Sequence, residues 1–434
     1  MARAPSSPLR VERALRLIPD LEELTPLRAL ISAVSLTSSN RSPYDTVGKR
    51  FLDPAELRRL EPQVVQEAAA AISSVLHASI AVLELEQARD REAAIQALIE
   101  AGAAEDRAGR YRQAEAWYAC ALRESEDLRD LEPKTRALRC LGRVAMERGR
   151  FHDASRFLDE SLALAEADQN PEEAASACRD LGDFEARRLD WNRADTWYRR
   201  GTYFPRVSPP LLISLHLGVA DAARERGDSA MAAEFLRTAR DAAQTVGDPA
   251  VDAGCLAACG RLEASRGNHA VALLTYRRAL EDRSGIRLSP QNEMDVRLDI
   301  SRLYLLWREL PRADEELQAA EDFAVRGNLR RHLVRFYAIR GRVSGRERDE
   351  TGFVFFEKAL ELCRAAEPAP AWLEAEVCYD YGLFRAELGN LEESRAHLGH
   401  AIDLLRPIGH HLLINRIEAK IRDLHDSEHP PTAR

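Results

Sequence analysis

Three arginines, Arg136, Arg139 and Arg143, are of a type and spacing that could bind acidic groups. The spacing of i, i+3 and i+7 puts them on one stripe of a helix, opposite Leu138 and Leu141. A guanidinium group carries its donors in a fixed fork, which fits a carboxylate bidentately. The stripe is therefore a candidate surface for capturing acidic groups.

Two further clusters have spacings that suit metal ligands. His397 and His400 lie three residues apart on a predicted helix, one turn after Glu393. We interpret them as surface residues of that helix. Cys255 and Cys259 share a helix face, and small core cysteines are far more common than ligand pairs of this kind. We therefore predict neither a metal site nor a cofactor site.

The motifs that mark common catalytic sites are absent from the sequence. It has no G-x-G-x-x-G after a predicted strand, no G-x-x-x-x-G-K-S/T, no H-E-x-x-H and no G-x-S-x-G. Catalysis needs a converging set of groups with perturbed pKa values, and no such set converges in the sequence. We expect a protein that is not an enzyme.

The composition argues against several other classes. The 62 basic and 71 acidic residues give a net charge of -9, so no nucleic-acid partner is expected. The seven cysteines form no C-x-x-C pair, which indicates neither a zinc ribbon nor a disulfide framework. No run approaches the roughly 20 apolar residues that span a bilayer. The start of the chain lacks the apolar core of a signal peptide. We expect a cytoplasmic protein without membrane insertion.

A recurring pattern predicts the elements that position these residues. The segment 141–162, LGRVAMERGRFHDASRFLDESL, places Gly142, Gly149, Phe151 and Ala154 at offsets that return in other segments. The position of Ala154 has counterparts at 114, 194, 232, 272, 313, 352 and 394. These positions define eight units with a period of about 40 residues, which is typical of a repeat protein. The glycines are therefore predicted to serve packing rather than ligand binding.

This pattern, L-G…Y…G-x-Y/F-x-x-A…Y…A-L, resembles the tetratricopeptide repeat (TPR) family in its longer variant. The resemblance covers about residues 96–406 and is strongest in the first, second, third and fifth units. The family's proline near the end of each unit is mostly absent. The resemblance implies an all-α fold, an α-solenoid of about eight antiparallel helix-turn-helix repeats in a right-handed superhelix, with helical caps at both ends.

The second unit illustrates the physical logic of the repeat. Residues 134–149 form a predicted first helix with Leu138, Leu141 and Ala145 on its apolar face, and Gly149 ends it at positive φ. Residues 151–167 form the second helix. Its inward-facing residues are Phe151, Ala154, Leu158 and Leu162. A single helix pair cannot bury this surface, so the units must stack.

Four regions follow from the pattern. Residues 1–90 are predicted to be an N-terminal helical cap or a degenerate repeat region, and 91–408 the solenoid. Residues 409–425 are predicted to form a capping helix, and 426–434 a disordered tail.

In the TPR family the first helix of each repeat faces the concave groove, so the resemblance implies a groove with a basic centre. The arginines placed there are Arg136, Arg139, Arg143, Arg179, Arg261 and Arg302. They share this wall with Gln96, Asp183, Asp221 and Asp295. Two interpretations stay open: the arginines bind an acidic peptide or a partner's C-terminus, or they form salt bridges across units. The family's lysine/asparagine clamp for chaperone C-termini is not matched.

These observations favour a non-catalytic scaffold or adaptor that binds a partner peptide or protein in its groove. The alternative is a ligand- or peptide-sensing regulator whose solenoid changes curvature on binding. Long repeats of this kind resemble the sensing regions of bacterial regulators and response-regulator phosphatases. An effector module for such a regulator has room only in the first 90 residues. An enzyme is the third class, and a metal in the purified protein would favour it.

Overall fold

The structure is a computed structural model of the 434-residue chain. The residues that it describes are 91–107, 110–126, 128–188, 190–281, 290–326, 330–364, 371–408 and 411–428. The predicted cap at 1–90 and residues 429–434 of the predicted tail lie outside them.

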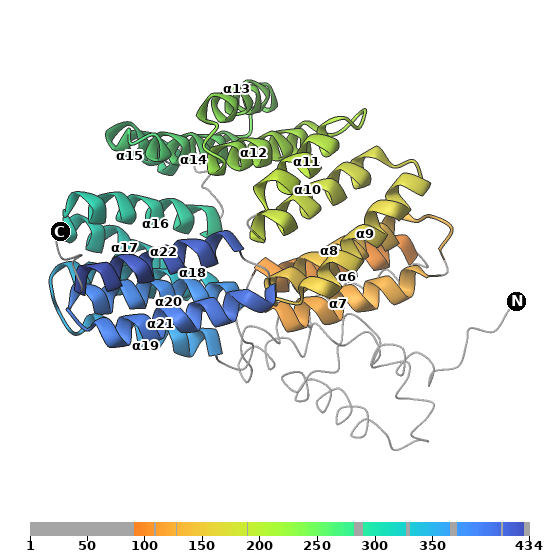
Figure 1. Cartoon of the computed structure of the whole chain (residues 1–434). Coiled ribbons are helices and arrows are strands. Elements are labelled where there is room, and N and C mark those ends of the chain that lie inside the picture. Colours follow the sequence, from red (N-terminus) through yellow and green to blue (C-terminus); the bar gives the residue numbers. More distant parts are fainter. Residues whose placement is uncertain are drawn as a thin grey trace, which may run out of the picture. The chain divides into compact units, whose positions relative to one another are not determined.

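The described residues form helices and no strand, in eight consecutive pairs followed by a last helix (Figure 1). The first four pairs are α6 (Arg91–Arg107) and α7 (Tyr111–Ser125), α8 (Glu132–Glu147) and α9 (Phe151–Ala167), α10 (Pro171–Arg187) and α11 (Trp191–Thr202), and α12 (Pro209–Glu225) and α13 (Ser229–Val246). The other four are α14 (Pro249–Ser265) and α15 (His269–Leu280), α16 (Pro290–Trp307) and α17 (Leu310–Arg326), α18 (Arg330–Arg346) and α19 (Gly352–Arg364), and α20 (Ala371–Glu387) and α21 (Leu391–Leu405). The short 3-10 helix η2 (Arg406–Ile408) and helix α22 (His411–Glu428) follow.

These bounds agree with the predicted repeat. The second helix of the second repeat runs over 151–167 as predicted, and each of the eight predicted repeats corresponds to one helix pair. The first helix of that repeat begins and ends two residues earlier than the predicted 134–149, so Gly149 lies in the turn that follows it. The last helix differs in its bounds: it begins at His411 and extends three residues past 425, into the predicted tail.

The chain divides into two compact units. Among the described residues, the first unit contains 91–145 and 156–169, and the second contains 146–155 and 170–428. In the first unit α7 packs on α6 with Trp117 and Tyr118 fully buried. Ser161 Oγ of α9 donates a hydrogen bond to the Thr135 carbonyl of α8 at 3.0 Å.

The second unit is built by regular stacking. The two helices of every pair pack on each other, and each second helix packs on the next first helix. Successive first helices, from α10 to α20, also pack in series. A core of buried side chains runs from Leu256 to Leu424, and the stacked rings of Phe356 and Tyr381, with centroids 4.7 Å apart, lie within it. The unit is therefore an α-solenoid.

Glycines let the two helices of a repeat approach closely. A Cβ atom added to Gly260 of α14 would lie 2.6 Å from Cδ1 of Tyr276 on α15. Tyr198 of α11 contacts two such glycines, Gly182 of α10 and Gly218 of α12. The aromatic ring fills the space that a side chain would take, so these glycines pack against rings as the sequence predicted.

Helix ends follow from local chemistry. Asn170 accepts a hydrogen bond from the Glu173 amide at 3.2 Å, and Pro171 begins α10 where no intrahelical amide donor is needed. In the turn between the helices of a pair, Gly149 and Gly267 have φ of 73° and 79°. Arg308 occupies the same turn position with a φ of 59°, which a side chain adopts at a cost.

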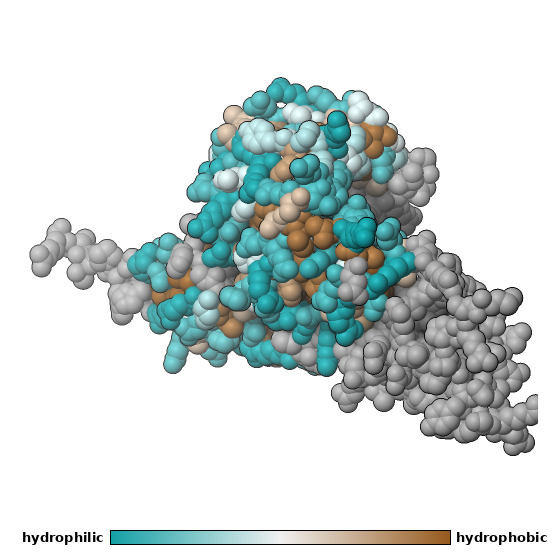
Figure 2. Space-filling model, turned by 90° about the vertical axis from the view of Figure 1, so that its right-hand side faces the viewer, coloured by the Kyte–Doolittle hydropathy of each residue, from teal (hydrophilic) through white to brown (hydrophobic). Residues whose placement is uncertain are grey.

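Hydrophobic residues form patches within a largely hydrophilic surface on the face drawn in Figure 2. Large apolar side chains that stay exposed include those of Tyr203, Leu274 and Leu306. None of the helices in the described ranges is both long enough and apolar enough to cross a membrane.

Candidate functional site

The predicted groove arginines of the first unit make contacts between helices. Arg136 Nη1 donates to Gln96 Oε1 on α6 at 2.7 Å, and its Nη2 pairs with Glu132 Oε1 at 2.6 Å. Arg143 Nη2 pairs with Asp106 Oδ2 on α6 at 2.9 Å. Arg139 lies partly buried on the same helix. The cross-repeat pairing that the sequence left open thus occurs at Arg143.

The three predicted arginines of the second unit have three different surroundings. Arg179 pairs with its chain neighbour Asp180 at 2.7 Å. Arg261 of α14 reaches back to Asp221 of α12 at 3.3 Å. Arg302 of α16 pairs at 3.2 Å with Asp299, and half of its side chain (52%) is exposed. Arg302 is therefore the most accessible of the three.

Further ion pairs that the sequence did not single out continue this series through α18 and α20. Arg335 of α18 lies 3.8 Å from Asp295 of α16 and 3.8 Å from Glu376 of α20. Arg342 of α18 lies 3.7 Å from Asp380 of α20. The signal was present, since these pairs are 38 to 41 residues apart and so lie about one repeat period from each other. We call the whole set the charged row: Arg179, Asp183, Asp221, Arg261, Asp295, Arg302, Arg335, Arg342, Glu376 and Asp380.

Burial and neighbouring charge set the pKa values along the charged row. Burial alone would raise the pKa of Asp221, but Arg261 and Arg224 outweigh it and hold that pKa below its usual range. Burial raises the pKa of Asp183, which accepts a hydrogen bond from the Tyr198 hydroxyl at 2.7 Å.

Asp380 of α20 is a carboxyl group of the charged row with a raised pKa. Burial, together with the nearby Glu376 carboxylate, raises its pKa to about 6. The guanidinium groups of Arg342, Arg302 and Arg416 oppose this shift only in part. The charged row therefore contains both ion-paired arginines and a carboxyl group with a raised pKa.

Trp372, at the start of α20, adds an aromatic element beside the charged row. Its ring lies 5.3 Å from the Arg187 guanidinium of α10 and 5.8 Å from that of Arg335. Such distances are typical of cation–π contacts. They bring the third and eighth repeats together at one buried indole.

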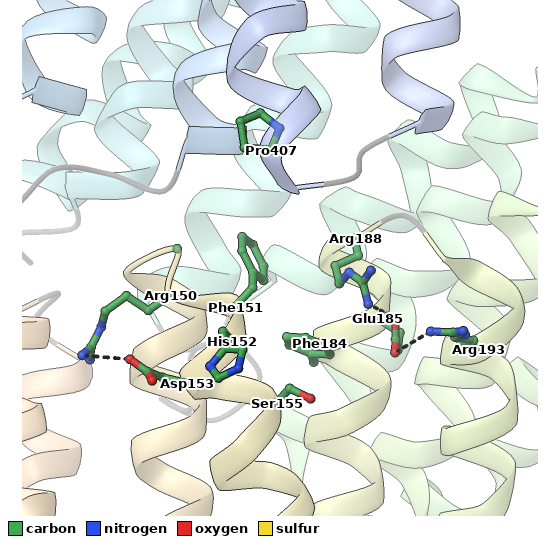
Figure 3. Close-up of a pocket in the computed structure, with 11 residues that line it drawn as sticks. Arg150, Phe151, His152, Asp153, Ser155, Phe184, Glu185, Arg188, Arg193 and Pro407 are labelled. Atoms are coloured by element: carbon green, nitrogen blue, oxygen red, sulfur yellow. Dashed lines mark hydrogen bonds and ion pairs between the residues drawn. The ribbon is translucent and has the colours of Figure 1, made fainter.

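A pocket of about 700 Å³ lies between the turn that precedes α9 and the end of α10 (Figure 3). Phe151 and Phe184 line it with ring centroids 6.0 Å apart. In Figure 3 these rings and His152 lie between two ion-paired groups. Arg150 and Asp153 form one, and Glu185 with its two arginines, Arg188 and Arg193, forms the other. Sequence reasoning did not predict this pocket.

The other candidate ligands have structural contacts. His397 stacks on Tyr381 with ring centroids 4.0 Å apart, and His400 lies 3.8 Å from Glu374. Cys255 is buried, and Cys259 is partly buried on the same helix. Within the described ranges, no group of three or more His, Cys, Asp or Glu residues is placed to hold a metal ion.

No protein-family model matches the sequence, and no curated protein matches it either. Among solved structures, the chain is similar to the Rap conjugation gene regulator of the plasmid pLS20, solved in complex with a Phr peptide. The TM-score is 0.51 at 12% identity over 94% of this chain and 97% of that one. A tetratricopeptide repeat protein from Parabacteroides merdae matches with a TM-score of 0.42 at 16% identity, over 62% of this chain and 93% of that one.

The chain has a TPR-like helical-repeat fold. The quorum sensor NprR from B. thuringiensis also matches, with a TM-score of 0.44 at 15% identity over 88% of this chain and 99% of that one. In this TPR-like fold the charged row lies on first helices, and the pocket of Figure 3 lies at helix ends. The two features therefore occupy different parts of the repeat.

Proposed function

We propose that this TPR-like protein is a non-catalytic scaffold that binds a carboxylate-bearing peptide segment along the charged row. The observation that carries the proposal is the state of Arg302. It is half exposed on a first helix, and its guanidinium pairs with Asp299 through Nη1 alone. A guanidinium has five N–H donors, so Arg302 keeps donors for a bidentate contact with an incoming carboxylate.

The surroundings of Arg302 support a peptide rather than a small anion. The carboxyl groups near Arg302, those of Asp299, Asp380, Glu376 and Asp295, attract a partner's cationic groups. Arg335 and Arg342 attract its acidic ones. A row of mixed sign suits an extended segment that carries both charges. The pLS20 Rap regulator, with the same fold, was solved with a peptide bound, which supports a peptide ligand here.

A peptide library tests the proposal. Each acidic peptide is paired with a copy in which Asp and Glu are replaced by Asn and Gln and the C-terminus is amidated. We expect the full chain to retain acidic members and to lose them with Arg302→Glu. Arg406→Glu is the matched control, because Arg406 also pairs with an acid three residues earlier, Asp403 at 3.3 Å, but at the exposed junction of α21 and η2.

The result that would overturn the proposal is equal retention of acidic and neutral peptides. Unchanged retention by the Arg302→Glu variant would overturn it as well. Circular dichroism of both variants checks that the helices are intact.

A second candidate function, peptide sensing, is favoured by the ion pairs between successive first helices. Arg335 and Arg342 link α18 to α16 and α20. A ligand carboxylate that takes over either guanidinium would loosen that link, so binding would alter the packing of adjacent repeats. Amide hydrogen exchange of α18, measured with and without a retained peptide, tests this second function. Unchanged exchange would contradict peptide sensing and leave only the scaffold function.

A further inference from the structure

The pocket of Figure 3 has the size of a small-molecule site. Its volume of about 700 Å³ lies within the range of roughly 300–1,000 Å³ that is common for ligand pockets. It is lined by residues at helix ends of the second unit, and none of its lining residues belongs to the charged row. Whatever binds there is therefore recognised by a separate set of contacts.

One side of the pocket is aromatic and firmly held. Phe184 is buried, and Phe151 is partly buried with its ring tilted 57° to that of Phe184. Phe151 also packs against the hydrophobic core formed by the C-terminal repeats, so contacts other than that with Phe184 hold its ring in place. Phenyl rings offer no hydrogen bonds, and this side suits an apolar group.

Beside Phe184, the region where α10 ends and α11 begins supplies guanidinium groups that are incompletely paired. The buried Glu185 accepts a hydrogen bond from Arg188 Nη1 at 3.2 Å and lies 3.8 Å from Arg193 Nη1. Arg193 is 65% exposed, and its Nε lies 3.5 Å from Asp190, which is outside the pocket lining. One buried carboxylate thus serves two guanidiniums, and both keep donors for an anion.

The Arg188 guanidinium connects the two sides. It lies 5.7 Å from the Phe184 ring, so a group that stacks on the phenylalanines ends beside a cation. Three of the lining side chains are arginines and two are acids, and Asp190, just outside the lining, also pairs with Arg193. A ligand with an apolar body and a single negative charge satisfies both sides.

We propose that this pocket binds an apolar monocarboxylate. Its ring or hydrocarbon part packs on Phe151 and Phe184, and its carboxylate accepts hydrogen bonds from Arg188 and Arg193. Two sources have this chemistry, a free carboxylic acid and the C-terminal apolar residue of a peptide.

Calorimetric titration of the full chain with 3-phenylpropionate tests the proposal. We expect saturable binding, with the neutral 3-phenylpropionamide about tenfold weaker because a charge-assisted hydrogen bond is lost. Arg188→Gln should weaken binding of the acid by a similar factor. Arg193→Gln, at a largely exposed position, gives a second variant that leaves the hydrophobic core unchanged.

The repeat architecture offers a matched control. Arg266 follows α14 as Arg188 follows α10, with a similar ion pair to Glu263 at 2.8 Å and similar exposure, 31% against 35%. Arg266 does not line the pocket. Arg266→Gln should therefore bind 3-phenylpropionate as the wild type does.

N-acetylphenylalanine distinguishes the two sources. Tighter binding than 3-phenylpropionate assigns the pocket to a peptide C-terminus, and weaker binding assigns it to a free acid. The proposal is overturned if neither acid binds, if the amide binds as well as the acid, or if both arginine variants bind as the wild type does. Arg302→Glu should leave this titration unchanged, so failure here is distinct from failure of the peptide-scaffold proposal.

Discussion

Arg261 Nη2 lies 3.3 Å from Asp221 Oδ2, and the two residues are 40 positions apart in the chain. One repeat period thus separates the partners of an ion pair that joins α14 to α12. Arg335 and Asp295 repeat the relationship at 3.8 Å, again 40 positions apart. The period of the sequence therefore has a direct electrostatic counterpart between first helices.

Removing this ion pair tests its contribution to stability. We expect Arg261→Ala to lower the free energy of unfolding by about 0.5–1 kcal/mol, since both side chains are partly exposed. Arg261 holds the pKa of Asp221 low, so the effect should be present at neutral pH and fade as the pH falls through that lowered pKa. Urea unfolding of both single variants and the double variant with Asp221→Ala gives the coupling, and a coupling of zero would contradict the prediction.

Replacing glycine by alanine should have opposite effects on stability at two positions of α14. Gly260→Ala places a Cβ 2.6 Å from the Tyr276 ring and should cost about 1–3 kcal/mol. Gly254→Ala meets no atom within 4 Å and should stabilise by about 0.5–1 kcal/mol through helix propensity. Thermal unfolding followed by circular dichroism compares them. A similar loss at both positions would show that the glycines do not serve close packing.

The positive φ of Arg308 strains the turn, and a glycine at this position should relieve the strain. Arg308 has a φ of 59°, whereas Gly267 holds the same turn position one repeat earlier at 79°. Arg308→Gly should raise the free energy of unfolding by about 1 kcal/mol, because glycine adopts this region without a Cβ clash. The converse change, Gly267→Arg, should lower it by a similar amount. Equal melting temperatures for both variants and the wild type would refute the expectation.

Asp380 should make stability depend on pH. Its folded-state pKa of about 6 lies above the usual 3.8, so the folded form binds the proton more tightly than the unfolded chain does. Its contribution to the free energy of unfolding therefore becomes less favourable as the pH rises from about 4 to about 6. Relative to the wild type, the Tm of Asp380→Asn should rise over that interval. The exposed Asp403→Asn controls for loss of a charge, and a flat difference for Asp380→Asn would contradict the prediction.

Most of the fold could be predicted because the repeat's packing residues are local and chemically distinctive. Gly260, Ala272 and Tyr276 each have one role that few residue types fill, and all three pack as the repeat pattern implies. The ion pairs could not be assigned in the same way. Arg179, for example, pairs with the adjacent Asp180, a choice made by side-chain conformation rather than by the period.

There is a physical reason why the sequence pattern did not indicate Arg335 and Arg342 of the charged row. In the seventh repeat Gly341 faces Phe356, fifteen residues later, whereas Gly182 and Gly260 face tyrosines sixteen residues later. The register of α18 is therefore shifted by one residue. Counting back from position 352 as in the other repeats places Val334 and Gly341 on the wall of the groove. The charged side chains instead stand one residue later, at Arg335 and Arg342.

The pocket of Figure 3 was missed for another reason. The position of Phe151 predicted that it stacks on the next repeat, and its contact with Phe184 confirms this. The pocket also depends on Pro407, more than 200 residues further along the chain. No local pattern records how closely such distant segments approach.

The ring of Tyr198 contacts glycines of two successive first helices, Gly182 and Gly218, and its hydroxyl group donates to Asp183. Repeat arrays often lengthen or shorten when recombination duplicates or excises one module. Here excision of the fourth repeat, residues 209–247, would remove Gly218. Ala257 or Ala258 of α14 would then lie near the Tyr198 ring, where there is no space for an extra methyl group. The third and fourth modules should therefore be inherited together, whatever happens to the number of modules elsewhere in the array.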